Sequence, residues 1–221
     1  MRPVVKLTLI AGGVLLLAAR QQGGQIDAAD GDVTGGFSVD ALTDNLQSYF
    51  YQLTDQGTNV DPNTAAANLS AFLAMIRQSE GADYSTCYGY SHTIQDFSDH
   101  PAVTGEWTGV VLPDAMCANA GYSPGCKSTA AGGYQIRKPT WVTVRDKLGL
   151  TDFSAASQDQ AAIQLISDRG ALGAVQSGDL QTAITRCRNE WASLPGNSYG
   201  QGGRSLDQLT AWYQTSGGTL A

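Results

Sequence analysis

The sequence predicts an α+β fold that is mainly helical, with a small β and loop lobe and a cleft between the two parts. Apolar residues recur at helical spacing in several segments of the chain. Residues 84–135 are rich in glycine and tyrosine instead, which predicts short strands and long loops and therefore the lobe. The predicted helices lie at residues 39–53, 69–80, 139–148, 157–168, 179–192 and 204–215.

Residues 1–24 form a separate hydrophobic segment, which is predicted as a helix that precedes the fold. Arg2 and Lys6 stand before an uncharged run at residues 7–19, and Arg20 closes it. The run is short for a membrane span, but a snorkelling Lys6 extends the apolar stretch to residues 4–19. We interpret the segment either as a membrane anchor or as a cleaved secretory signal. Both interpretations put the rest of the chain outside the cytoplasm.

Residues 25–67 are predicted as a linker that carries one amphipathic helix. Ser38 can cap this helix at residues 39–53, whose apolar side chains fall on one stripe. The stripe packs on the main domain or, alternatively, docks on another protein. Residues 55–67 are again predicted as linker, with Pro62 stopping any continuous helix. The main domain is therefore predicted at residues 68–221.

Glu80 is the strongest catalytic candidate because it falls on the apolar face of the helix predicted at residues 69–80. Asn68 is the predicted N-cap, and the apolar stripe runs to Ile76, four positions before Glu80. Gly81 then ends the helix, which places the glutamate at a rim. Desolvation there favours the protonated form, as a general acid requires. The alternative is a solvated last helical turn in which Glu80 faces water.

The cysteine spacing predicts one disulfide and no metal site. Cys117 and Cys126 close a short loop and form the predicted pair. Cys187 lies in a helical pattern and is predicted as a buried thiol, which leaves Cys87 free or in an alternative pairing. The rival interpretation is zinc, but the chain has only two histidines and no C-x-x-C spacing. We therefore predict neither a metal nor a cofactor.

The charge of the chain speaks against nucleic acid as a partner. The formal net charge is −7 over 221 residues. A nucleic-acid-binding protein usually presents a basic surface, whereas this chain is acidic.

Several segments resemble those of the bacteriophage lambda endolysin family. Residues 71–81 (AFLAMIRQSEG) resemble the segment around that family's catalytic glutamate. The further matches follow in the family's order, and together they cover roughly residues 68 to 218. They are residues 97–101 (FSDHP), 127–135 (KSTAAGGYQ), 157–162 (SQDQAA), 169–172 (RGAL), 191–196 (WASLPG) and 199–201 (YGQ).

The resemblance implies a lysozyme-like catalytic domain at residues 68–221, with the activity of a peptidoglycan lytic transglycosylase. Such an enzyme cleaves the β-1,4 bond between N-acetylmuramic acid and N-acetylglucosamine and leaves a 1,6-anhydromuramic end. Glu80 would act first as acid and then as base, so one carboxylate is enough, whereas glycosidases generally use two. The implied substrate-binding residues are Ser79, Asp99, Ser128, Tyr134, Gln135, Tyr199 and Gln201.

Gly133 departs from the pattern of the family, and Trp191 is an aromatic residue in a matched segment. Where Gly133 stands, the family is expected to have a larger and often basic residue, so a glycan contact is missing or is supplied from elsewhere. Trp191 is predicted to be core rather than a sugar platform, because Cys187 and Leu194 flank it at helical spacing.

Other functions remain open on the sequence. A hydrolytic muramidase would need a second carboxylate, for which Asp83, Asp96, Asp99 and Glu106 are candidates. A different class is a catalytically silent, anchored module of the wall or virion. The expected partners are peptidoglycan glycan strands, a membrane through residues 4–19, and a virion or envelope protein through residues 39–53. The expected location is the periplasm, by export or anchoring, or the virion, for wall degradation at host lysis or at entry.

Overall fold

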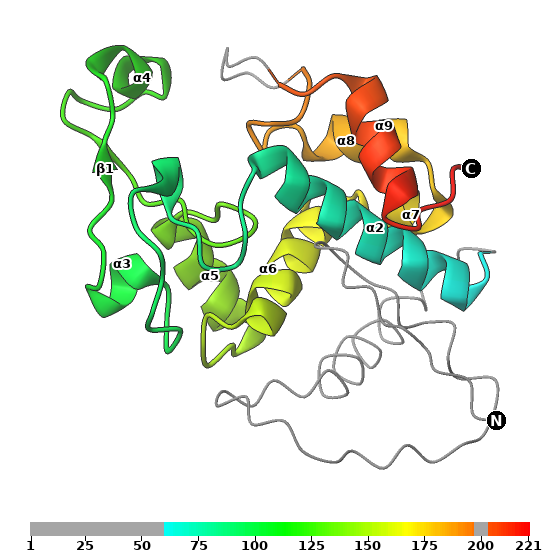
Figure 1. The fold of residues 1–221 in the computed structure, drawn as a ribbon, viewed down its shortest axis with the longest axis horizontal. Coiled ribbons are helices and arrows are strands. Elements are labelled where there is room, and N and C mark those ends of the chain that lie inside the picture. Colours follow the sequence, from blue (N-terminus) through cyan, green and yellow to red (C-terminus); the bar gives the residue numbers. More distant parts are fainter. Residues whose placement is uncertain (1–59, 197–202) are drawn as a thin grey trace, which may run out of the picture. The chain divides into compact units, whose positions relative to one another are not determined.

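The computed structural model describes residues 60–196 and 203–221, and they form a mainly helical fold with one small sheet, as the sequence predicts (Figure 1). The predicted segments 1–24 and 39–53 lie outside these residues, as do Tyr199 and Gln201. No helix in the described ranges is long and apolar enough to cross a membrane. In chain order the elements are α2 (Pro62–Glu80), η2 (Tyr88–Tyr90), α3 (Pro101–Thr104), β1 (Val110–Val111), α4 (Asp114–Asn119), β2 (Lys127–Ser128), α5 (Lys138–Leu148), α6 (Ala155–Asp168), α7 (Leu172–Ser177), α8 (Leu180–Cys187) and α9 (Leu206–Thr215).

The long helix α2 begins earlier than the sequence predicted. Asp61 is the N-cap, since its carboxylate accepts a hydrogen bond from Thr64 N at 2.9 Å. Pro62 stands in the first turn, where a missing amide hydrogen does no harm. The prediction that Asn68 caps the helix is therefore wrong. Asn68 is buried inside the helix, where its side chain bonds the backbone of two distant segments, and residues 62–67 are helix rather than linker.

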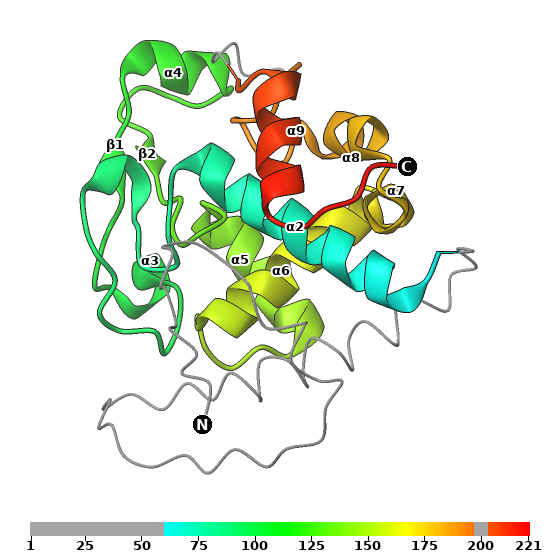
Figure 2. The same cartoon turned by 45° about the vertical axis from the view of Figure 1, so that its right-hand side comes forward.

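The apolar stripe of α2 forms the centre of the core, as predicted. Leu69, Phe72 and Ile76 have no solvent exposure. Figures 1 and 2 show α2 running between α6 and α9, and α2 contacts both of them as well as α7. The helix ends at Gly81, which adopts a left-handed conformation with φ of 66°. Glu80 is consequently the last helical residue, at the end of a helix whose apolar face is buried in the core.

The remaining helices agree with the sequence in part. The predictions at residues 139–148, 157–168 and 204–215 correspond to α5, α6 and α9 within about two residues, a normal uncertainty for helix ends. The prediction at 179–192 is too long, because α8 stops at Cys187 and the next residues form turns whose amides bond Cys187 O. The helices α3, α4 and α7 were not predicted, since each has only four to six residues.

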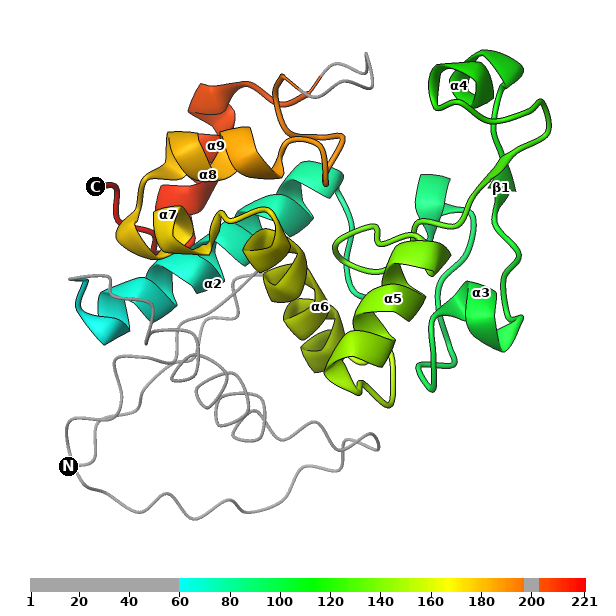
Figure 3. The same cartoon turned by 180° about the vertical axis from the view of Figure 1, so that it is seen from behind.

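The lobe at residues 84–135 contains more loop than strand. Its two strands, β1 and β2, have two residues each and pair antiparallel, with Val110 opposite Ser128. Figures 1 and 3 show α3 and α4 at opposite ends of β1. Glycines are needed here for close approach: a side chain at Gly109 would meet Ser128 O at 2.6 Å.

The predicted disulfide between Cys117 and Cys126 is present and closes the loop that joins α4 to β2. The Cα atoms of the two cysteines are 5.8 Å apart. Cys87 and Cys187 are both buried free thiols, as predicted for Cys187. A cross-link of this kind stabilises a protein mainly by restricting the unfolded chain.

Removal of this disulfide is expected to lower the free energy of unfolding. With Cys117 and Cys126 both replaced by serine, the loss should be about 2 to 3 kcal/mol, because the closed loop is short. Urea denaturation of the double variant measures the loss, and reduction of the unaltered protein provides the control. An unchanged urea midpoint in both experiments would contradict the prediction.

Candidate active site

A cleft of about 1030 Å³ lies between the C-terminal end of α2, the lobe, and the chain that follows α8. The sequence predicted such a cleft between the lobe and the helices. Of the predicted site residues, Ser79, Glu80, Ser128, Tyr134 and Gln135 line it, and Asp99 does not.

Glu80 is half-buried at the wall of this cleft. The Ser193 hydroxyl donates a hydrogen bond to Glu80 Oε1 at 2.6 Å. Burial raises the pKa of Glu80 above its ordinary value, while hydrogen bonding to Ser193 and the positive charge of Arg204 oppose the rise. The net effect is a carboxyl group that holds its proton to a higher pH than an exposed glutamate does.

Ser79 lies behind Glu80 and connects to it through Ser193. The Ser79 hydroxyl is buried, 2.8 Å from the Ser193 hydroxyl and 2.8 Å from Ile76 O. Arg204 Nε donates to Ser79 O at 3.3 Å, and the backbone amide of Arg204 bonds Ser193 O at 2.8 Å. The structure thus gives Ser79 a supporting position beneath the cleft wall rather than a free face towards a ligand.

Ser193 and Arg204 are site residues that the sequence analysis did not assign. Ser193 lies inside the matched segment WASLPG, so the resemblance contained a signal for it. Arg204 carried no such signal, because its contact with the end of α2 joins parts of the chain that are far apart in sequence.

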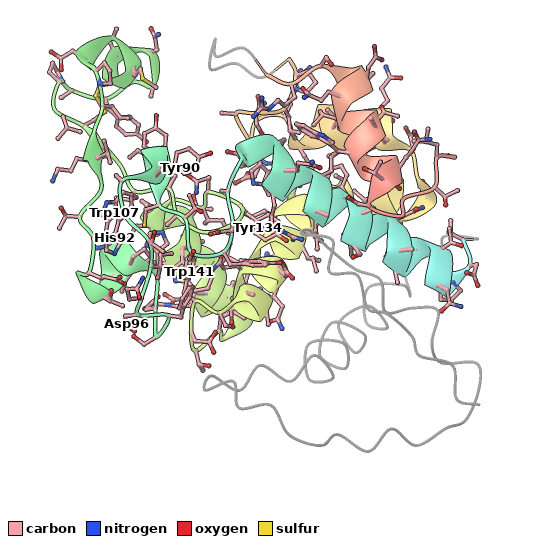
Figure 4. The ribbon with its side chains drawn as sticks, in the orientation of Figure 1. Tyr90, His92, Asp96, Trp107, Tyr134 and Trp141 are labelled. Carbon is pink, nitrogen blue, oxygen red and sulfur yellow. A yellow bond between two sulfur atoms is a disulfide. The ribbon has the colours of Figure 1, made fainter. Side chains whose placement is uncertain are left out.

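Tyr134 and Gln135 line the cleft, but their polar atoms bond mainly to the protein. The Tyr134 hydroxyl accepts a hydrogen bond from Arg77 at 2.5 Å and donates to Asp159. Figure 4 shows Tyr134 at the helical side of the lobe. The amide of Gln135 donates to Thr86 O at 3.1 Å and to Gly132 O at 2.9 Å. Both residues therefore shape the cleft wall.

Arg77 explains the glycine at position 133. A Cβ atom placed on Gly133 would lie 2.7 Å from Arg77 Cδ, so the arginine side chain occupies the space that a larger residue would need. The guanidinium group of Arg77 bonds Tyr134 and lies 3.5 Å from Asp159. The basic group near this position is therefore engaged inside the protein.

Asp99 is the predicted site residue that the structure does not bring to the cleft. Its carboxylate accepts hydrogen bonds from Trp141 Nε1 at 2.7 Å, from His100 N at 2.7 Å and from Arg145. These bonds fasten the lobe to α5. The carboxylate of Asp99 makes its hydrogen bonds within the fold, which argues against a substrate-binding role.

The other carboxylates considered as second catalysts also lie away from the cleft. Asp83 accepts from the Ser85 and Thr86 hydroxyls, and Asp96 accepts from Ser98 N. Glu106 accepts from two backbone amides and lies 2.7 Å from His92 Nε2. Figure 4 shows Asp96 and His92 on the lobe. None of Asp83, Asp96 and Glu106 lines the cleft.

Glu190 is the only other carboxylate among the described residues that line the cleft. It forms a salt bridge with Arg169 through Oε2 at 2.7 Å. The sequence analysis did not consider Glu190. The arrangement therefore has one half-buried carboxyl group with a raised pKa and one carboxylate held by a guanidinium group.

Comparisons with known proteins identify the family of the chain. The sequence model of a family described as Endolysin matches residues 70–220. The chain is 40% identical over 157 residues to the endolysin of Escherichia phage P2, which covers 70% of this chain and 95% of the relative. It is 41% identical over 159 residues to the endolysin of Escherichia phage lambda, which covers 68% of this chain and 91% of the relative.

Two solved structures of bacteriophage lambda lysozyme are similar to this fold. Bacteriophage lambda lysozyme in complex with a chitohexasaccharide matches with a TM-score of 0.59 and 38% identity, over 70% of this chain and 97% of the other. A second structure of the lambda lysozyme gives a TM-score of 0.58 over the same shares.

Proposed function

Because the chain belongs to the endolysin family, we propose that it is a peptidoglycan lytic transglycosylase with Glu80 as its single acid and base. The chain is a lysozyme-like, wall-degrading enzyme of the phage endolysin type. Such an enzyme cuts the glycan strand of peptidoglycan.

The environment of Glu80 is the observation that supports the proposal best. A general acid must carry its proton at the working pH, and burial raises the pKa of Glu80 in that direction. In the proposed mechanism, Glu80 gives this proton to the glycosidic oxygen as the bond to the anomeric carbon breaks. The N-acetyl group of the substrate shields the anomeric carbon. The Glu80 carboxylate then takes the proton of the C6 hydroxyl as that oxygen closes the 1,6-anhydro ring.

The two serines next to Glu80 suit a group that is first acid and then base. With Glu80 ionised, the Ser193 hydroxyl donates to it and can accept from Ser79, which lies 2.8 Å away. With Glu80 protonated, the direction of these hydrogen bonds can reverse. Glu80 then donates to Ser193, Ser193 donates to Ser79, and Ser79 donates to Ile76 O. Both protonation states therefore find hydrogen-bond partners without movement of heavy atoms.

The shortage of carboxylates in the cleft favours a transglycosylase over a hydrolase. Hydrolytic glycosidases generally place a second carboxylate across the scissile bond. Among the described cleft residues only Glu190 could take that role, and its salt bridge with Arg169 engages it. A hydrolytic muramidase that uses Glu190 is thus the second candidate, in place of one that uses Asp83, Asp96, Asp99 or Glu106.

The substrate and the place of action are parts of the same proposal. The chitohexasaccharide bound by lambda lysozyme supports a glycan strand as the ligand of the cleft. The disulfide between Cys117 and Cys126 supports an oxidising compartment such as the periplasm. Delivery by residues 4–19, and a virion or envelope partner for residues 39–53, rest on the sequence pattern.

Mass spectrometry of the released muropeptides tests the proposal. Gram-negative peptidoglycan is digested with the full chain, with its Glu80→Gln variant and with a known muramidase. We expect products one water lighter than those of the muramidase, and none from the variant. Products with reducing ends would favour the hydrolase and would direct attention to Glu190.

Replacement of Ser193 by alanine is expected to move the pH dependence of the reaction. The variant loses a hydroxyl that donates to Glu80, so the pKa of Glu80 rises further. Because the acid works in its protonated form, the basic limb of the kcat profile should shift to higher pH. Ser177→Ala is the control, since the Ser177 hydroxyl donates to Ala174 O and Ser177 does not line the cleft. A shift to lower pH in Ser193→Ala would contradict the assignment.

A further inference from the structure

Two residues other than glycine have a positive φ in the described part of the chain, and both line the cleft. They are Tyr90, with φ of 54°, and Gln135, with φ of 47°. Side chains with a Cβ rarely adopt this conformation, and it costs free energy where it occurs. Gln135 has an evident structural reason, because its amide bonds two backbone carbonyls.

Tyr90 has no comparable reason in the turn that it occupies. The turn runs from Tyr88 to Ser91, with Ser91 N bonded to Tyr88 O at 3.4 Å, and its central residues Gly89 and Tyr90 both have positive φ. This is the pattern of a type I′ turn, whose second central position strongly favours glycine. A tyrosine at that position is therefore strained, where a glycine would not be.

Burial of the Tyr90 ring does not offset the free energy cost of this strained backbone. The residue is 76% exposed, more than any other large hydrophobic residue in the described ranges. It lies on η2 in the lobe (Figure 4). Its hydroxyl donates a hydrogen bond at 2.7 Å to the backbone oxygen of Gly81, the residue after Glu80. This bond holds the hydroxyl end of the ring at the catalytic end of α2, while most of the side chain is exposed and lines the cleft.

We propose that Tyr90 is a sugar-binding platform, on which a pyranose ring of the glycan stacks next to Glu80. The inference rests on the proposed function only in taking a glycan as the ligand. An aromatic ring offers a flat apolar face to the C–H bonds of a sugar, and the Gly81 bond fixes its orientation before the ligand arrives. Exposed aromatic side chains of the described residues gather at this cleft, since Tyr122, which is 50% exposed, also lines it.

The competing explanation is that Tyr90 only ties the lobe to α2 through its hydroxyl. Three variants separate the two roles. Tyr90→Phe keeps the ring and loses the hydroxyl. Tyr90→Gly loses both and removes the backbone strain. Tyr90→Ala loses both but keeps the strain, because alanine still has a Cβ.

Calorimetric binding of chitohexaose to the full chain tests the proposal. All proteins carry Glu80→Gln, so no bond is cleaved and the result does not depend on whether the enzyme is a transglycosylase or a hydrolase. We expect Tyr90→Phe to bind within about twofold of the parent, and Tyr90→Gly and Tyr90→Ala to bind about three- to tenfold more weakly. Val111→Ala is the matched control, because Val111 is exposed on the same lobe but does not line the cleft.

Thermal unfolding of the same variants shows whether weaker binding comes from a loss of stability rather than from the loss of the ring. We expect the Tm of Tyr90→Gly to exceed that of Tyr90→Ala by about 2 to 4 °C, although both bind equally weakly. Binding by Tyr90→Gly within twofold of the parent would overturn the proposal. It would also be overturned if Tyr90→Phe bound as weakly as Tyr90→Gly, because the hydroxyl tie and not the ring would then be responsible.

Discussion

Replacement of Glu80 by glutamine is expected to lower kcat on peptidoglycan by about 10³- to 10⁴-fold, the upper range for loss of a general acid and base. The amide cannot supply the first proton or accept the second, and no other described carboxylate of the cleft is free of a salt bridge. Turbidity loss of a wall suspension measures the rate, and retained chitohexaose binding shows that the cleft is intact. A loss of less than tenfold would remove Glu80 from the mechanism.

The same variant has an expected effect on stability that depends on pH. The pKa of Glu80 is raised in the folded state, so the folded protein binds more protons than the unfolded chain above the ordinary glutamate pKa of about 4.3. The contribution of Glu80 to the free energy of unfolding therefore falls as the pH rises from there through the folded pKa. Glutamine does not titrate, so Glu80→Gln should gain stability relative to the parent over that range, in urea unfolding at a series of pH values.

Replacement of Arg77 by methionine is expected to lower the free energy of unfolding by about 3 to 5 kcal/mol, because it leaves a buried carboxylate without its cation. Asp159 is 8% exposed, and its carboxylate bonds the hydroxyls of Tyr84 and Tyr134 beside the Arg77 guanidinium. The guanidinium also stacks over both rings, 4.9 Å from the centre of Tyr84 and 5.5 Å from that of Tyr134. Urea denaturation at neutral pH measures the loss.

A second substitution provides the control for this prediction. In Arg77→Met with Asp159→Asn, no charge is left unpaired, so part of the lost stability should return. The penalty of the single variant should also shrink at low pH, because burial already raises the pKa of Asp159 and protonation removes the unpaired charge. A loss below about 1 kcal/mol in the single variant would contradict this account.

Local pattern was enough to predict the features that depend on one segment at a time. The stripe of α2 and the glycine after Glu80 fixed the helix face, its end and the position of the carboxyl group. The short loop between Cys117 and Cys126 was enough for the disulfide. Pro62 was misjudged because a proline that breaks a helix and one that begins it look alike until the cap, Asp61, is recognised.

Site features that depend on contacts between distant parts of the chain could not be predicted from the sequence. Ser193 and Arg204 reach Glu80 and Ser79 from a distant part of the chain, and no spacing within one segment encodes that meeting. Asp99 matched the family in sequence, but Trp141 and Arg145 engage its carboxylate away from the cleft. A short polar motif could not distinguish a residue that binds a ligand from one that holds the lobe.

The origin of the oxygen in the product tests the central claim most directly. Peptidoglycan is digested by the full chain in water enriched in ¹⁸O, and the new muramic ends are weighed by mass spectrometry. If Glu80 drives ring closure by the C6 hydroxyl, no ¹⁸O enters the new ends and each is one water lighter than a reducing end. Incorporation of one ¹⁸O per cleavage would mean that water attacks the anomeric carbon, and would contradict a single-carboxylate transglycosylase.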